Sequence, residues 1–242
     1  ILLIIIYFIL CKHNLSQLFL FNKMVYKRMK EIFHFGKYLA GNSIVSMGYI
    51  PFITLVITRY IGLSEVTYFN ISWKIYSRIK AFFMKGLNGI LPHAAKLNIL
   101  FKTEDDKTLR SNLINLYKKT LKFVYFFGFL PVIIMIVFCD YIMILWLKES
   151  FHPMISFSIR VLFFALLFEL CSLPIWNIFI AINKPKYNLY SSVIRILSSI
   201  PVIIGLFILH LINYRSMILL VGFETLLVTT YLIYKFHTLL NN

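Results

Sequence analysis

Residues 161–181 read VLFFALLFELCSLPIWNIFIA, and Glu169 is the single charged side chain among these 21 positions. At about 1.5 Å of rise per residue, a helix of this length crosses the roughly 30 Å hydrocarbon core of a bilayer. Hydrophobic runs of similar length recur along the chain and predict six membrane-spanning helices. The predicted spans are residues 38–58, 67–93, 123–146, 155–182, 187–211 and 216–234.

The composition of the whole chain agrees with this interpretation. Of its 242 residues, 60% are hydrophobic and 14% are charged, and the mean hydropathy is +0.81. Soluble domains are only about 45–50% apolar. The formal net charge is +16, but the basic residues are interleaved with the hydrophobic runs, which favours membrane lipids over nucleic acid as partners. The sequence therefore predicts an all-α, polytopic transmembrane helix bundle that does not bind nucleic acid.

Three segments are predicted along the chain. Residues 1–10, ILLIIIYFIL, are apolar but cover only about half of a bilayer core, which indicates the truncated end of a preceding transmembrane helix. Residues 11–36 carry apolar side chains at helical spacing opposite lysines, the pattern of an amphipathic linker at the cytoplasmic membrane surface. Residues 37–242 hold the six predicted spans.

The charges of the connecting segments predict the orientation. Sixteen lysines and arginines fall on one side of the predicted spans, in residues 11–37, 94–122 and 183–186 and at Lys235, and four fall on the other side. Cytoplasmic loops of membrane proteins carry the excess of basic residues. We therefore expect residues 11–37 and the C-terminus to be cytoplasmic.

Sequence signatures of enzymes are missing. The six histidines show no spacing typical of metal ligands, and the chain contains no GxSxG, Walker or GxGxxG motif. The three cysteines lie in or beside apolar segments, where packing is their usual role. We predict no catalytic residues, no metal and no cofactor, hence no enzyme.

Three cations in the second predicted span share one helix face. At 100° per residue from Lys74, Arg78 falls at 40° and Lys85 at 20°, so the three side chains form a stripe about 16 Å long. In lipid they would cost about 3 kcal/mol each, which favours a stripe that faces water, a polar cavity or an anionic ligand. Snorkelling to the two interfaces is the structural alternative. Lys80 falls at about 240°, and the sequence predicts no role for it.

The later spans contain three more charges: Glu169, Arg195 and Glu224. One interpretation is structural, with buried ion pairs such as Arg195 with Glu224. The other is functional, with Arg195 in the same anion-binding site as the stripe and Glu169 or Glu224 coupled to a proton or sodium ion. The sequence alone leaves both open.

Several stretches together resemble the polysaccharide (O-antigen) flippases of the multidrug/oligosaccharidyl-lipid/polysaccharide exporter superfamily. The similarity lies in degenerate helix and loop motifs, over about residues 37–235. The matching stretches are residues 60–71 (YIGLSEVTYFNI), 90–97 (ILPHAAKL), 117–119 with Pro131, 140–147 (DYIMILWL) with Phe151, and 183–186 (NKPK). The chain departs from the usual pattern by carrying Thr67 where a small glycine is more common.

The resemblance implies the second, six-helix lobe of a two-lobe transporter in the bacterial inner membrane. It implies translocation of an undecaprenyl-pyrophosphate-linked oligosaccharide by alternating access, with Lys74, Arg78, Lys85 and Arg195 as substrate-binding residues. The implied partners are the lipid-linked oligosaccharide, the missing N-terminal lobe and other polysaccharide assembly proteins. Three alternatives stay open: a drug/cation antiporter of the same superfamily, a membrane-embedded polysaccharide-processing enzyme, and an inactive fragment.

Overall fold

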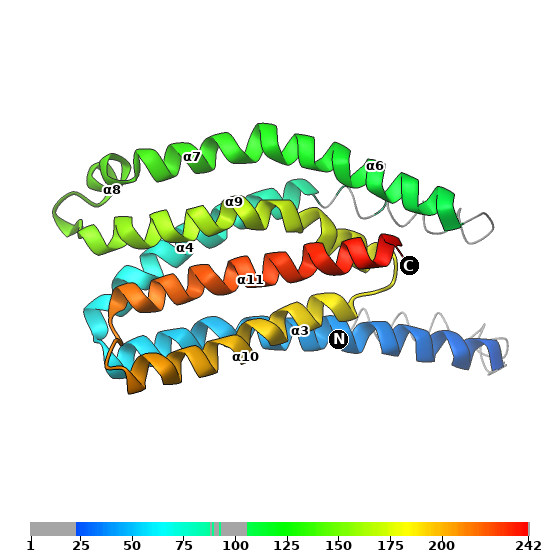
Figure 1. Cartoon of the computed structure of the whole chain (residues 1–242), viewed down its shortest axis with the longest axis horizontal. Helices are drawn as coiled ribbons and strands as arrows, with labels where there is room; N and C mark the ends of the chain where they lie inside the picture. The colour runs from blue at the N-terminus through cyan, green and yellow to red at the C-terminus, as the bar shows by residue number, and fades with distance from the viewer. Residues whose placement is uncertain (1–22, 88, 90–91, 93–105, 242) are drawn as a thin grey trace, which may run out of the picture.

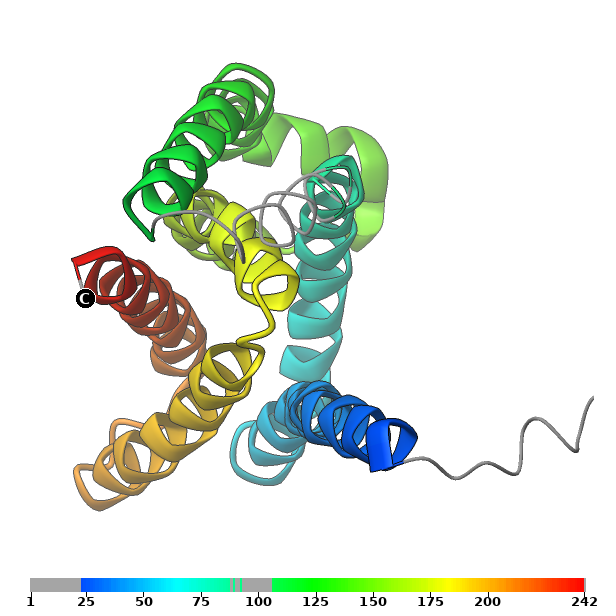
Figure 2. The ribbon, with the colours of Figure 1, turned by 90° about the vertical axis from the view of Figure 1, so that its right-hand side faces the viewer.

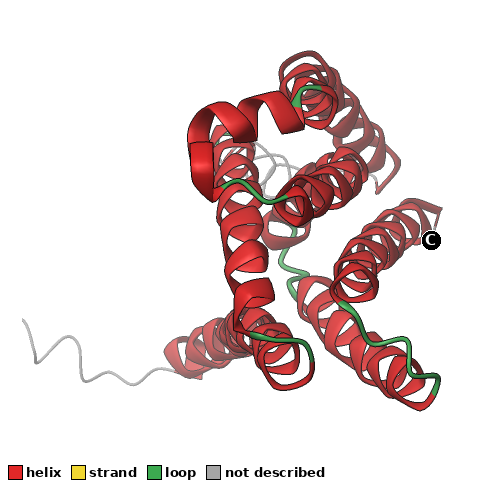
Figure 3. Cartoon of the chain, turned by 90° about the vertical axis from the view of Figure 1, so that its left-hand side faces the viewer, coloured by secondary structure: helices red, strands yellow, loops and turns green. Residues whose placement is uncertain are grey.

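The computed structural model describes residues 23–87, 89, 92 and 106–241, and the regular structure in these residues is entirely helical (Figures 1 and 3). This confirms the all-α helix bundle. The predicted helix end at residues 1–10 and the first part of the predicted linker, residues 11–22, lie outside the described residues.

The first described helix, α3, joins two segments that the sequence separates. It runs from Lys23 to Tyr60 and passes without a break through the predicted boundary between residues 36 and 37. No side chain packs against Gly36, and one glycine costs only about 1 kcal/mol in a helix. The polar and apolar parts of α3 therefore form one continuous helix, which also continues through Pro51.

A tight turn at Gly62 leads from α3 into α4, Leu63–Leu87. Gly62 has a φ of 154°, and a side chain there would meet a carboxylate oxygen of Glu65 at 2.6 Å. From this turn α4 runs obliquely across the bundle and ends beneath α6 and α7 (Figures 1 and 2). It therefore lies against the central helix, α9, along much of its length.

The third predicted span differs from the observed one. α6 (Asp106–Val124), a π-helical turn (Tyr125–Phe129) and α7 (Leu130–Val137) follow one another as a single long segment. The chain then leaves helical geometry at Phe138 and begins α8, Cys139–Leu147, followed by a 3-10 turn, Lys148–Ser150. The predicted span 123–146 thus begins near the end of α6 and includes a separate short helix.

The last three predicted spans are confirmed as α9 (Pro153–Ala181), α10 (Lys186–Ile208) and α11 (Tyr214–Asn241). α9 is central: it packs against α4, α7 and α11, and most of its side chains are buried. One end of the bundle holds the N-terminal end of α3, the turn from α9 to α10 and the C-terminus (Figure 1). In the predicted orientation this is the cytoplasmic end.

Five helices in the described part of the chain are long and apolar enough to cross a membrane. They are residues 29–60, 110–137, 153–181, 186–208 and 214–240. The chain is therefore a multi-pass membrane protein. α4 does not qualify by composition because it carries Glu65, Lys74, Arg78, Lys80 and Lys85, yet its 25 residues are about 37 Å long.

Candidate functional site

The charged helix α4 presents two different faces. Lys74, Arg78 and Lys85 are exposed on the outer face, and none of them has an ion-pair partner among the described residues. Tyr76 and Lys80 point to the opposite face, toward α9. The helical angles calculated from the sequence separate the same two sets. We call Lys74, Arg78 and Lys85 the cationic stripe.

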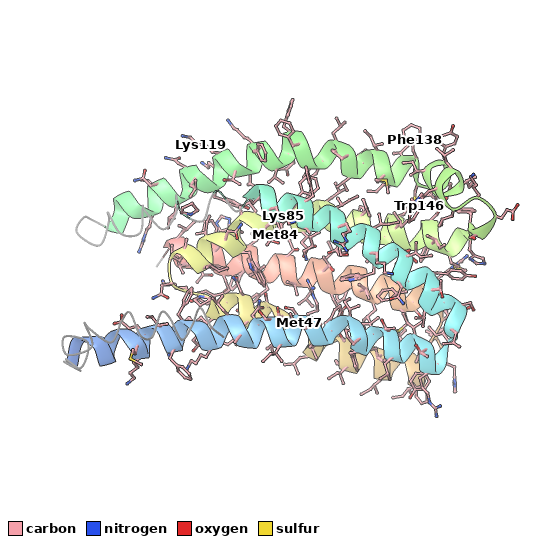
Figure 4. The ribbon with its side chains drawn as sticks, turned by 180° about the vertical axis from the view of Figure 1, so that it is seen from behind. Met47, Met84, Lys85, Lys119, Phe138 and Trp146 are labelled. Carbon is pink, nitrogen blue, oxygen red and sulfur yellow. The ribbon has the colours of Figure 1, made fainter. Side chains whose placement is uncertain are left out.

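The stripe occupies one half of α4. The middle of Leu63–Leu87 is Ile75, so Lys74 and Arg78 lie within about 5 Å of the helix centre along its axis. Lys85 is in the last turn, toward the same end of the bundle as Lys119 and opposite Phe138 and Trp146 (Figure 4). The stripe thus runs from the predicted cytoplasmic end of α4 to its middle.

Behind the stripe, Glu169 of α9 holds a group of polar side chains inside the bundle. Lys80 Nζ lies 2.6 Å from Glu169 Oε1, and the Tyr76 hydroxyl donates to Glu169 Oε2. Arg195 of α10 approaches the same Oε1 at 3.8 Å. The side chain of Glu169 is 7% exposed and that of Lys80 27%, so the carboxylate is more deeply buried than its cation.

A second carboxylate, Glu224 of α11, belongs to the same group. Its Oε2 accepts a hydrogen bond from the hydroxyl of Tyr49 on α3, and the residue is 0% exposed. The Arg195 guanidinium lies 5.5 Å from the centre of the Tyr49 ring, so Arg195 is near both Glu169 and the tyrosine that binds Glu224. We define the buried charge cluster as Tyr49, Tyr76, Lys80, Glu169, Arg195 and Glu224.

The cluster connects α3, α4, α9, α10 and α11. Two cations and two carboxylates inside an apolar bundle are tolerated only because they face one another, since an isolated buried charge costs several kcal/mol. Two buried atoms of the cluster have no hydrogen-bond partner among the described residues, Glu224 Oε1 and Arg195 Nε. The cluster therefore joins five helices. Both oxygens of Glu169 have a partner, whereas only one oxygen of Glu224 does.

The predicted site residues are not all together. The stripe residues lie on one exposed face of α4 as the spacing predicts, whereas Arg195 is in the interior, paired with Glu169. In place of the suggested pairing of Arg195 with Glu224, the structure pairs Arg195 with Glu169, and Glu224 accepts a hydrogen bond from Tyr49.

The sequence reasoning missed Lys80, Tyr76 and Tyr49. A signal for Lys80 was available, because its angle of about 240° turns it away from the stripe and toward the bundle, where a cation needs a carboxylate. The described residues contain no group of three or more His, Cys, Asp or Glu side chains that could hold a metal ion.

The comparison with known families gives a match to the polysaccharide biosynthesis protein family over residues 1–156. The chain belongs to this family. The family includes flippase-type proteins, which confirms the resemblance found in the sequence. The match covers the stripe and the α3 and α4 parts of the buried charge cluster, and no curated protein or solved structure matches the chain.

A role in polysaccharide biosynthesis or transport follows for this family member. The stripe and the buried charge cluster are two places where charged side chains interrupt the apolar packing of the described bundle. Both include residues of α4, the helix that carries too many charges to be among the candidate spans. We therefore take the outer face of α4 as the candidate functional site, and the cluster behind it as the candidate support.

Tyr49→Phe tests whether the Glu224 half of the cluster stabilises the bundle. Removing the hydroxyl takes away the hydrogen bond to a fully buried carboxylate, which we expect to lower the free energy of unfolding by about 2 kcal/mol. Unfolding in detergent micelles, followed by circular dichroism, measures it. Tyr214→Phe is the control, since its hydroxyl bonds the neutral Ser158 and its loss should cost about 1 kcal/mol. Equal costs would contradict the assignment.

Proposed function

We propose that this family member translocates an undecaprenyl-pyrophosphate-linked oligosaccharide, an O-antigen or capsule repeat unit, across the bacterial inner membrane by alternating access. The main support is the contrast between cations that are paired with a carboxylate and cations that are not. Lys80 and Arg195 are paired with Glu169, whereas the stripe cations near the middle of α4 have no acidic partner among the described residues. An unpaired cation at that depth calls for an anion or water.

The chemistry of a pyrophosphate matches the stripe. Arginine and lysine donate charge-assisted hydrogen bonds to phosphate oxygens, and arginine does so through two parallel bonds. Neither side chain has to change protonation state during transport. The stripe therefore binds the head group without a catalytic step, as a carrier requires, and we propose a transporter and not an enzyme.

The position of the stripe suggests a direction. Lys85 lies at the end of α4 that we predict to be cytoplasmic, and Arg78 and Lys74 lead from there to the helix centre. The other half of α4, residues 63–73, contains no basic residue. A pyrophosphate that comes from the cytoplasmic leaflet would meet cations as far as the middle of the membrane and would be released beyond them.

Two partners are part of the proposal. The stripe is an exposed face, so a closed chamber requires a second wall, which we assign to the N-terminal lobe of a two-lobe transporter. Other polysaccharide assembly proteins would supply the lipid-linked oligosaccharide or take it up. The cytoplasmic C-terminus belongs to the same proposal and follows from the basic residues at that end of the bundle.

In the drug/cation antiporter alternative, the carboxylates Glu169 and Glu224 would be the functional residues. Glu169 is already saturated by Lys80, Tyr76 and Arg195, which argues against it as an open cation site. Glu224 retains one oxygen without a described partner and stays the stronger of the two predicted coupling residues. A strict need for Glu224 with a dispensable stripe would support the antiporter.

Arg78→Ala in the protein expressed in its own cell tests the proposal directly. We expect surface polysaccharide to fall to background while the protein stays in the membrane fraction, because the central cation for the pyrophosphate is lost. Immunodetection of surface polymer and of the membrane-inserted chain measures both. Arg59→Ala is the matched control, because Arg59 is an exposed arginine in the last turn of α3 and not part of the stripe. Normal surface polymer with Arg78→Ala would refute the role.

A further inference from the structure

A pocket of about 550 Å³ lies at the predicted cytoplasmic end of the bundle, away from both the stripe and the buried charge cluster. One wall belongs to α3, with Lys30 and Tyr38, and the other belongs to the turn between α9 and α10, with Lys184 and Lys186. The two walls are about 150 residues apart in the sequence. We call this the interfacial pocket, and we propose that it binds the phosphate head group of an anionic phospholipid.

The depth of the pocket matches the head-group layer. Three candidate spans have their ends there: residues 29–60 begin, residues 153–181 end and residues 186–208 begin. The pocket therefore lies where the apolar parts of three helices meet the polar phase. Aromatic side chains with one polar edge favour this layer, and His34 and Tyr38 line the pocket in edge-to-face contact at 5.1 Å.

The excess of positive charge in the pocket favours an anionic ligand. Three lysines and one carboxylate, Glu31, line it, so its lysines outnumber its carboxylates by two. Lys30, Lys184 and Lys186 are exposed and have no ion-pair partner among the described residues. Basic pockets between membrane helices on the cytoplasmic side bind anionic lipid head groups.

The turn that carries two of the lysines is held in place. The backbone N–H of Lys184 donates to the carbonyl oxygen of Phe179 at 2.8 Å, and Asn183 adopts a φ of 60°, which asparagine tolerates. Pro185 is buried, and Lys186 Nζ lies 5.2 Å from the centre of the Tyr187 ring. The backbone that carries the two lysines is thus preorganised, which lowers the entropic cost of binding.

Phosphatidylglycerol is the probe for the test, with phosphatidylcholine as the neutral reference. The intact purified chain is titrated with each lipid in detergent, and native mass spectrometry counts the bound lipids. We expect Lys184→Gln with Lys186→Gln to weaken phosphatidylglycerol binding about 25-fold, and either change alone about fivefold. Lys186→Gln should not disturb the fold, because a lysine in the first turn of α10 opposes the helix dipole.

A matched pair and an opposite charge change make the test decisive. Lys118→Gln with Lys119→Gln removes the same charge from exposed positions of α6, and we expect less than a twofold effect there. Glu31→Gln removes the carboxylate of the pocket and should strengthen binding about fivefold, a gain that misfolding does not produce. Equal losses in the two lysine pairs, no gain with Glu31→Gln, or displacement of the lipid by millimolar inorganic phosphate would overturn the proposal.

Discussion

Glu169→Gln is expected to lower the free energy of unfolding by about 3 kcal/mol, near the lower end of the cost of breaking a buried ion pair. The substitution keeps the shape of the side chain but leaves Lys80 and Arg195 inside the bundle without their carboxylate. Partial exposure of the Lys80 side chain, 27%, keeps the loss from being larger. Reversible unfolding in mixed micelles, monitored by circular dichroism, measures the change.

An exposed ion pair of the same length provides the control for this prediction. Arg160 and Asp140 also approach to 2.6 Å, but their side chains are 43% and 51% exposed. Asp140→Asn should therefore cost less than about 1 kcal/mol, because water replaces the lost partner. If the two substitutions had equal effects, burial would not be the reason for the stability of the Glu169 pair.

Replacing a cation of the cluster should lower the free energy of unfolding by less than replacing Glu169 does. After Lys80→Gln, Glu169 still has Arg195 at 3.8 Å and the hydroxyl of Tyr76, so the loss should be smaller than for Glu169→Gln. After Glu169→Gln, both cations lose their partner at once. A larger effect of Lys80→Gln would show that Arg195 does not act as the second counter-ion.

Lys74→Gln combined with Arg78→Gln is expected to lower transport about a thousandfold, to background in a surface-polymer assay. A charge-assisted hydrogen bond contributes about 2 kcal/mol, which corresponds to roughly thirtyfold for each of the two residues. Transport of a fluorescent polyprenyl-pyrophosphate oligosaccharide from the outer (cytoplasmic) leaflet of inverted vesicles into their luminal leaflet measures it. Arg78→Lys keeps the charge but loses the planar pair of donors, so an intermediate rate is expected.

The stability of the same variant separates binding from structure. Lys74 and Arg78 are exposed and have no ion-pair partner among the described residues, so their neutralisation should leave the free energy of unfolding unchanged or raise it. Lys118→Gln with Lys119→Gln controls for the general loss of positive charge. Loss of transport together with loss of stability would show that the stripe supports the bundle and binds no ligand.

Particular residues show how far the sequence could predict the site. The stripe was predictable because Lys74, Arg78 and Lys85 belong to one helix, and the angles within a helix depend only on residue number. Arg195 was grouped with them by charge alone. Its true neighbours, Glu169 and Tyr49, come from α9 and α3, and nothing in the sequence around Arg195 distinguishes them from Glu224.

The boundary of the third span shows a similar limit for the fold. Hydropathy is continuous from residue 123 to residue 147, so the sequence predicts one span there. The structure ends α7 at Val137 and turns at Phe138, and the buried thiol of Cys139 then donates to the carbonyl oxygen of Ser156 on α9. Packing against α9 decides the end of the helix, and hydropathy does not record it.

The sequence by itself determined that this protein is a multi-pass helical membrane protein of the polysaccharide biosynthesis family, because the length of an apolar run and its helical period are local properties. Only the tertiary structure decided which charges are neutralised. Lys80 meets Glu169 from 89 positions away, and Tyr49 meets Glu224 from 175. Such pairs depend on how α3, α4, α9, α10 and α11 pack together, and the cations left without a partner become visible only once these pairs are known.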